Sequence, residues 1–266
     1  GKGMLDAAVS GNVFSSPSPD RIEAAIEKVE KGQGVLFVIK NYSGDIMNFG
    51  MAQDMAEMEG IQVESVVVKD DVAVPDSTYS TGRRGIAGTM FVHKIAGAMA
   101  ETGAPLSEVA GVAREVVENL RSMGMAMSPC ILPAVGRPGF TLGENEIEIG
   151  MGIHGEPGVE KTTMKTAKEI AEILLQKILD DYDYEGSEVA VLVNGLGGTP
   201  LMELYILNYE VQKLLKEKNI TAYKTFVGNY TTSLEMTGCS LSLLKLNDKM
   251  KTLLDASCDT PALKID

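Results

Sequence analysis

The sequence predicts an α/β protein of two domains, each with a mixed sheet flanked by helices. Short continuous apolar runs, such as "GVLFVIK" and "SEVAVLV", are typical of strands buried on both faces. Segments with helical apolar spacing alternate with these runs. The length of 266 residues suffices for two modest domains. The Met-rich stretch 121–139 breaks both periodicities, so we expect one domain at residues 1–127, truncated at its start, and the other at residues 128–266.

The first half is expected to hold a βαβ unit followed by two helices. Ser18 is placed to cap a helix whose first position is Pro19, and apolar residues follow at helical spacing. The elements expected after this helix are a strand at 34–40, a helix through 51–60, a strand at 61–69 and helices at 85–101 and 105–123.

The second half is expected to alternate strands and helices in the same way. Its first strand, at residues 145–153, leads into the turn "HGEPG". The elements expected next are a helix from Thr162 to Asp181, a strand at 187–193, a glycine turn at 194–200, a helix at 201–218 and strands at 221–227 and 237–246. Such strand–turn–helix corners are where α/β proteins usually place their sites.

The composition argues against several classes of partner. A net charge of −13 provides no basic surface for phosphates, which disfavours nucleic acid and an anionic membrane surface. No apolar run in this sequence is long enough to cross a bilayer, and we expect no signal peptide. The three cysteines are widely spaced and include no CxxC pair, so we expect buried thiols, with neither a disulfide framework nor a zinc site. A cytoplasmic protein is therefore expected.

The first candidate functional residue is His154 in "EIGMGIHGEPG". Gly152 and Gly155 are expected to leave room beside the ring, Glu156 to orient or charge it, and Pro157 to stiffen the turn. A neutral imidazole acts as a base, a metal ligand or a nucleophile. Metal binding is the weakest of these, because no second His or Cys lies at ligand spacing. The alternative is a structural turn histidine bonded to the backbone.

A second candidate site is "IKNYSGD", at the carboxyl end of the strand 34–40. Asp45 follows a Ser-Gly turn, where the ligand crevices of α/β proteins open. An acidic residue there is also a common helix cap. Lys40 faces either a polar ligand or solvent. The second histidine, His93, lies inside a helical pattern and is interpreted as an ordinary helix residue.

Three further motifs carry weaker predictions. Asp70 and Asp71 are candidate Mg²⁺ ligands, although adjacent acids at a strand end are more often solvated. Arg83 and Arg84 in "STGRRG" are candidates for gripping an anion, with a charged loop as the alternative. The turn "NGLGGTP" lacks the Gly-Lys-Ser/Thr ending of a phosphate loop, so no nucleotide site is expected in this chain.

Several motifs together resemble a known family. They are, in chain order, "GKGMLDAAVSGNVFSSPSPDRI", "IKNYSGDIMNF", "DDVAV", "TGRRGIAG", "EIGMGIHGEPG", "NGLGGTPLMELY" and "TTSLEMTG". The chain resembles the substrate-binding K subunit of dihydroxyacetone kinase from end to end. The resemblance implies that His154 attacks the ketone of dihydroxyacetone and holds it as a covalent hemiaminal. It also implies that Asp45 contacts a substrate hydroxyl and assists its deprotonation, and that Lys40 binds substrate. Glycerol, which has no carbonyl, would be rejected.

The resemblance also implies partners. A separate L subunit would carry ADP or ATP with Mg²⁺, so this chain would hold no cofactor and no metal of its own. A homodimer is expected by the same resemblance. The phosphoryl donor, ATP or a carrier of the phosphotransferase system, would depend on the L subunit.

One family motif is absent, and two alternatives stay open. The glycine-rich "GGGSGHEP" segment, which in the family grips substrate and supplies a histidine for proton transfer, does not occur. We therefore expect the native N-terminus to lie upstream. One alternative function is a regulatory paralogue that binds the same ligand and controls transcription through a partner protein. Another, less expected because no linker follows "TPALKID", is the first half of a single-chain ATP-dependent kinase.

Overall fold

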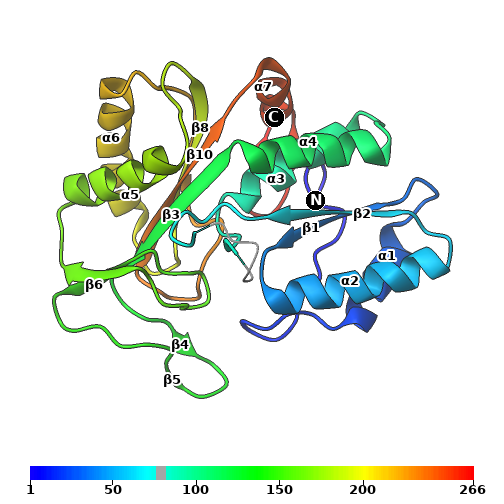
Figure 1. Ribbon diagram of the computed structural model, residues 1–266, viewed down its shortest axis with the longest axis horizontal. Coiled ribbons are helices and arrows are strands. Elements are labelled where there is room, and N and C mark those ends of the chain that lie inside the picture. The colour runs from blue at the N-terminus through cyan, green and yellow to red at the C-terminus, as the bar shows by residue number, and fades with distance from the viewer. Residues whose placement is uncertain (76–81) are drawn as a thin grey trace. The chain divides into compact units, whose positions relative to one another are not determined.

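The computed structural model describes residues 1–75 and 82–266 and divides the chain into two compact units (Figure 1). Each unit is assembled from separate segments. Unit 1 comprises residues 1–69, 89–118 and 248–266, and unit 2 comprises residues 70–88 and 119–247. This division differs from the single boundary expected after residue 127.

Unit 1 is built around two parallel strands. β1 (Val35–Lys40) pairs with β2 (Val63–Val68), and α2 (Ser43–Met58) connects them. Figure 1 shows α2 and α4 (Leu106–Glu118) on opposite sides of these strands. Apolar side chains of α1, α2 and both strands form a core, with Ile22, Ile26, Phe37, Ala52 and Val63 buried. The remaining elements are α1 (Pro19–Val29), α3 (Thr89–Glu101), α7 (Asp248–Asp255), β11 (Cys258–Asp259) and β12 (Lys264–Ile265).

Unit 2 is built around a six-stranded mixed sheet with the order β7-β6-β3-β10-β8-β9. β8 and β9 are parallel, and all other neighbours are antiparallel. Helices α5 (Ala167–Asp181) and α6 (Leu201–Glu217) pack against each other and against the sheet. The strands are β3 (Leu120–Ala126), β6 (Glu146–Ile149), β7 (Glu160–Thr163), β8 (Glu188–Gly195), β9 (Thr221–Gly228) and β10 (Gly238–Lys245), and β4 (Ile131–Leu132) pairs separately with β5 (Arg137–Pro138).

The predicted fold class, α/β with mixed sheets and flanking helices, is confirmed, but the predicted boundary stretch is a central strand. The helix expected to reach residue 123 ends at Glu118, and β3 begins at Leu120. β3 is buried along nearly its whole length, with β6 on one side and β10 on the other. A strand covered on both faces shows no polar alternation, so its sequence displays neither period. β3, which the prediction assigned to the first domain, thus belongs to unit 2.

Two helix starts also differ from the prediction. α2 begins at Ser43 instead of near residue 51, so the expected Ser-Gly turn is the first turn of a helix. The helix expected from Thr162 begins at Ala167, and Thr162 lies in β7. Thr166 and Glu169 form a reciprocal capping box at the true start. The Thr-x-x-Glu pattern of residues 166–169 predicts a helix that starts at this point, whereas the apolar spacing alone does not locate the start.

Candidate functional site

His154 lies in the loop that connects β6 to β7 in unit 2. The loop is closed at its base, where the Val159 amide donates to the Ile149 carbonyl over 2.8 Å. Gly150 and Gly155 have φ values of +80° and +81°, which only glycine adopts without strain. The imidazole is half-buried, with 31% of its side chain exposed. The loop therefore presents the ring from a narrow, glycine-bent turn.

Glu156 holds His154 through both the backbone and the ring. The His154 amide donates to Glu156 Oε2 over 3.0 Å, and His154 Nδ1 lies 3.0 Å from Glu156 Oε1. Burial opposes the charge on Glu156, but the hydrogen bonds from His154 and the charge of its protonated imidazole outweigh it and hold the pKa of this carboxyl below its usual value. An ionised carboxylate only accepts hydrogen bonds, so Nδ1 is the donor in this contact. In a neutral ring with this tautomer, the lone pair lies on Nε2.

The sequence predicts that Gly152 leaves room beside the imidazole of His154. In the structure it leaves room for the carboxylate of Glu156 instead. A Cβ atom at Gly152 would lie 2.1 Å from Glu156 Oε2 and 2.8 Å from Arg84 Nη1. Both distances are shorter than real Cβ contacts, so a side chain here would displace the end of Glu156 or of Arg84. Glycine at this position thus leaves the pairing of Glu156 with His154 undisturbed.

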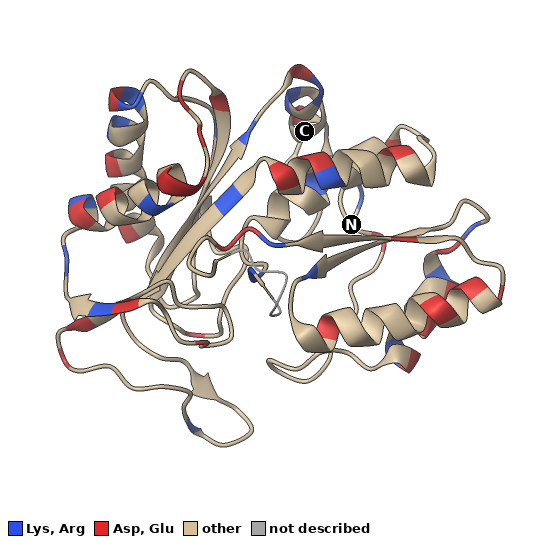
Figure 2. Cartoon of the chain, in the orientation of Figure 1, with Lys and Arg blue, Asp and Glu red and all other residues tan. Residues whose placement is uncertain are grey.

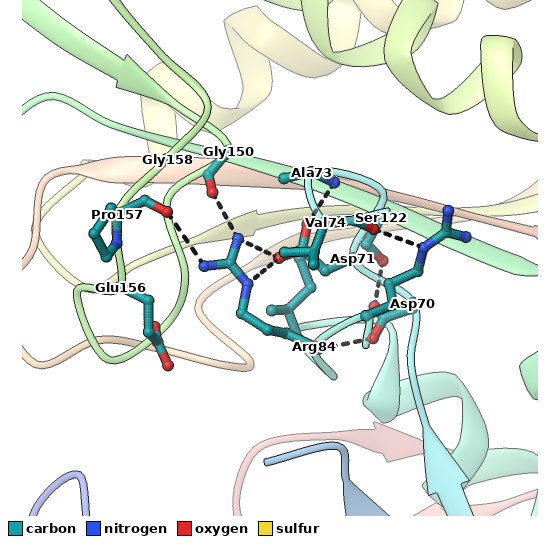
Figure 3. A network of polar contacts seen from close by, with 12 residues as sticks. Asp70, Asp71, Ala73, Val74, Arg84, Ser122, Gly150, Glu156, Pro157 and Gly158 are labelled. Atoms are coloured by element: carbon teal, nitrogen blue, oxygen red, sulfur yellow. Dashed lines mark hydrogen bonds and ion pairs between the residues drawn. The ribbon is translucent and has the colours of Figure 1, made fainter. Parts of the chain in front are cut away.

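The two adjacent acids, Asp70 and Asp71, are fully buried, so the expectation that they are solvated is wrong. Asp70 accepts from the amides of Ile86 and Gly88 over 2.7 and 2.9 Å and from the Ser122 hydroxyl. Burial raises the pKa of Asp70. Figure 3 shows Asp71 turned toward Arg84 instead. Among the described residues no cluster of three or more His, Cys, Asp or Glu side chains is arranged to hold a metal ion.

The two arginines expected to grip an anion are engaged within unit 2. Arg83 donates to both carboxylate oxygens of Asp181 over 3.0 and 2.6 Å. Arg84 Nε donates to Asp71 Oδ2 over 2.8 Å. Each guanidinium is therefore paired with a carboxylate of the chain. The first two residues of the "STGRRG" motif lie outside the described part of the chain.

The glycine turn that follows β8 serves packing. Asn194 Oδ1 accepts from the amides of Tyr230 and Thr231, and its Nδ2 donates to the Thr231 carbonyl over 2.8 Å. Gly197 has φ +117°, and a Cβ there would lie 1.8 Å from the Leu234 carbonyl oxygen. The glycines of "NGLGGTP" thus admit the neighbouring loop.

Lys40 and Asp45 lie in unit 1, at the two ends of the β1–α2 connection. Lys40 is the last residue of β1, and Asp45 stands in the first turn of α2, behind the capping residue Tyr42. A carboxylate in the first turn is favoured by the helix dipole. His93 in α3 is more than an ordinary helix residue, because burial, aided by the charge of Lys40, lowers the pKa of His93 to about 3. Its sequence context gave no signal of this.

Two predictions from composition concern the cysteines and membrane-spanning helices. Cys130, Cys239 and Cys258 are free and buried, as predicted. Burial raises the pKa of the Cys239 thiol to about 12. Within the described ranges no helix is long and apolar enough to span a membrane.

These features define the class: an α/β protein of two units whose glycine-bent loop presents a histidine backed by a carboxylate. The chain belongs to the Dak1 domain family, whose model matches residues 1–262. The dihydroxyacetone-binding subunit DhaK of PTS-dependent dihydroxyacetone kinase 1 from Listeria innocua is 50% identical over 264 residues, covering 98% of this chain and 80% of the relative. The predicted family resemblance is thereby confirmed, and several curated relatives are named as subunits of dihydroxyacetone kinases.

Two solved structures share the fold closely. The dihydroxyacetone kinase operon co-activator Dha-DhaQ has a TM-score of 0.92 and 36% identity, with 97% of this chain and 80% of that one covered. The dihydroxyacetone kinase of C. freundii, in complex with AMP-PNP and Mg²⁺, has a TM-score of 0.86 and 36% identity, with 97% and 47% covered. A nucleotide and Mg²⁺ thus occur in a relative that is about twice as long as the aligned chain.

Proposed function

We propose that this chain is the dihydroxyacetone-binding subunit of a dihydroxyacetone kinase. The observation that carries the proposal is the His154–Glu156 pair, in which Nδ1 of His154 lies 3.0 Å from Glu156 Oε1. In the proposal this carboxylate holds the proton on Nδ1, and Nε2 is the nucleophilic nitrogen. A nucleophile held by an oriented acceptor is the usual arrangement for covalent catalysis. The family membership supplies the substrate class, since the relative from Listeria innocua is named for binding dihydroxyacetone.

The proposed chemistry is a reversible addition to the ketone. Nε2 of His154 forms a bond to the carbonyl carbon, and the π electrons of the C=O bond move to the oxygen, which takes up a proton. The imidazole, now carrying a positive charge, loses its Nδ1 proton to water. The product is a neutral hemiaminal. Glu156 stabilises the charged ring during the addition because its own pKa is low enough to keep it ionised.

Asp45 and Lys40 have proposed roles from unit 1. Asp45 accepts a hydrogen bond from the substrate hydroxyl and assists its deprotonation, as a general base does. Lys40 binds the substrate. The phosphoryl group then comes from a separate nucleotide-binding L subunit that carries ADP or ATP with Mg²⁺. The PTS-dependent relative favours a phosphotransferase-system carrier as the ultimate donor. A homodimer in the cytoplasm completes the proposal.

One observation favours a second candidate function. The co-activator Dha-DhaQ has a TM-score of 0.92 with this chain, so the fold also serves a regulatory protein. The second candidate is therefore a dihydroxyacetone-binding regulator that controls transcription through a partner. Phosphoryl transfer to dihydroxyacetone in the presence of an L subunit separates the two, because only the kinase subunit supports turnover.

The experiment is a ¹³C NMR titration with dihydroxyacetone labelled at its carbonyl carbon, on the wild type and on His154→Ala. We expect a protein-bound signal at a tetrahedral-carbon shift in the wild type and none in the variant. The covalent mechanism would be refuted by spectra with only free ketone and hydrate signals. This result would have to be obtained both with this chain and with a chain extended by the family's upstream segment. A tetrahedral signal that survives in His154→Ala would place the bond on another residue.

A further inference from the structure

Arg84 lies between the two limbs of the loop that carries His154 (Figure 3). Its Nη2 donates to the Gly150 carbonyl over 2.7 Å, where the loop leaves β6. Its Nη1 donates over a longer 3.5 Å to the Pro157 carbonyl, where the chain returns. One planar guanidinium therefore spans both ends of the segment 150–157. A planar fork of fixed donors suits this task, whereas a flexible ammonium group does not.

Arg84 is itself fixed from behind. Asp71 Oδ2 lies 2.8 Å from both Nε and Nη2 of Arg84, and Asp71 Oδ1 accepts from the Ala73 amide over 3.0 Å. Asp71 is fully buried, and only 9% of Arg84 is exposed. A buried, hydrogen-bonded ion pair has little freedom to move, because neither charge can separate without losing its partner. The guanidinium is thus a rigid support for the loop.

The support reaches the catalytic pair at Gly152. A Cβ atom added at Gly152 would lie 2.1 Å from Glu156 Oε2 and 2.8 Å from Arg84 Nη1. The carboxylate that orients His154 and the guanidinium therefore both lie beside Gly152. We propose that Arg84, backed by Asp71, is a positioning residue that holds residues 150–157 so that Glu156 keeps the proton on His154 Nδ1. The inference rests on the proposed function for its effect on dihydroxyacetone, but the proton position on His154 is a property of the free protein.

The test compares Arg84→Lys with Arg83→Lys. Both replacements keep a positive charge beside a carboxylate, Asp71 in one case and Asp181 in the other. Arg84 is the one of the two that donates to the Gly150 and Pro157 carbonyls of the loop of His154 in the bonds described above. The first readout is the ¹⁵N spectrum of the imidazoles without ligand, which is simple because the chain has two histidines. The second readout is the affinity for dihydroxyacetone, measured from the tetrahedral-carbon signal.

We expect Arg83→Lys to match the wild type in both readouts. Arg84→Lys is expected to lose the single Nδ1-protonated pattern of His154 and to bind dihydroxyacetone about 100-fold more weakly, because a small misplacement of a reacting group has effects of this size. If Arg84→Lys gives the same His154 spectrum as Arg83→Lys, the proposal is overturned. A wild type without tetrahedral signal refutes the covalent function, while the ligand-free spectra still decide the role of Arg84.

A second variant covers the case in which Arg84→Lys does not fold. The double replacement Arg84→Gln with Asp71→Asn removes both buried charges together and so leaves neither unpaired. We expect this variant to be folded, with a cooperative unfolding transition in urea. We also expect its ¹⁵N spectrum to lose the Nδ1-protonated signals of His154. A double variant with the wild-type His154 spectrum would show that the loop needs no guanidinium and would overturn the proposal.

Discussion

At the scale of single residues, local and distant contacts were not equally readable. His154 and Glu156 are two positions apart, so the sequence alone indicated that the carboxylate would orient the ring. Arg84 and Gly150 are separated by 66 positions, and nothing in either local pattern pairs them. The arginine was therefore interpreted as an anion ligand. Distance along the chain, and not the chemistry of the side chains, set the limit of prediction at the candidate site.

Asp45 allows a test of the division of roles proposed for the substrate. Asp45→Asn removes the base but keeps the size and one acceptor oxygen of the side chain. We expect phosphoryl transfer with an L subunit to fall by about 100-fold or more, the usual contribution of a general base. Binding of dihydroxyacetone should change only a few-fold, whereas His154→Ala should abolish it. Steady-state kinetics and the ¹³C titration measure the two quantities.

Asp20→Asn is the matched control for this replacement. Asp20 is an exposed acid in the first turn of α1, as Asp45 is an acid in the first turn of α2. Each replacement removes a favourable interaction of a carboxylate with a helix dipole. Only Asp45→Asn should reduce turnover. Equal losses of binding in Asp45→Asn and His154→Ala would contradict the separate roles.

At the scale of elements, the presence of the helices was predicted, although several of their ends were not, and the central strand was missed. α1 has a polar face and begins at the predicted Pro19. β3 is covered on both faces, and the glycine and methionines of "RSMGMA" are weak strand formers, so neither period nor propensity marked it. The neighbour that identifies β3 is β10, more than 100 residues later, where Ser122 is paired with Ser242. Only the assembled sheet makes the segment a strand.

The β3–β10 pairing gives a stability prediction. Gly238 in β10 has no room for a side chain, because a Cβ there would lie 2.3 Å from the Met125 carbonyl and 2.9 Å from Leu196 Cδ1. Gly238→Ala should therefore lower the free energy of unfolding by about 1–3 kcal/mol, the usual cost of overpacking. Urea denaturation measures the change.

Gly111→Ala is the opposite case and serves as its control. Gly111 lies in α4, where an added Cβ meets no atom within 4 Å. Alanine is the better helix former, so the free energy of unfolding should rise by about 0.5–1 kcal/mol. A Gly238→Ala protein as stable as the wild type would mean that β3 and β10 are not packed as described.

At the scale of the whole molecule, one partly buried histidine couples folding to pH. Burial lowers the pKa of His93 from 6.5 to about 3, with the charge of Lys40 contributing. Between these values the unfolded chain binds a proton that the folded chain does not. The free energy of unfolding therefore decreases as the pH falls from 6.5 toward 3. Above pH 6.5 the ring is neutral in both states and has no such effect.

His93→Gln should remove this dependence. We expect the wild type to lose about 1–2 kcal/mol more stability than His93→Gln between pH 7 and pH 5, because only the wild type gains a proton at this position on unfolding. Urea titrations of both proteins at the two pH values give the difference. Parallel losses in the two proteins would show that His93 keeps its ordinary pKa in the folded state.

The interleaving of the two units has a consequence for how such proteins diversify. The chain passes from one unit to the other at residues 69–70, 88–89, 118–119 and 247–248. A single genetic crossover anywhere between the first and last of these points gives a hybrid in which at least one unit mixes two parents. After residue 127, for instance, β3 would come from one parent and β10 from the other. Recombination is therefore expected to exchange this chain whole more readily than in halves, and its units should share one evolutionary history.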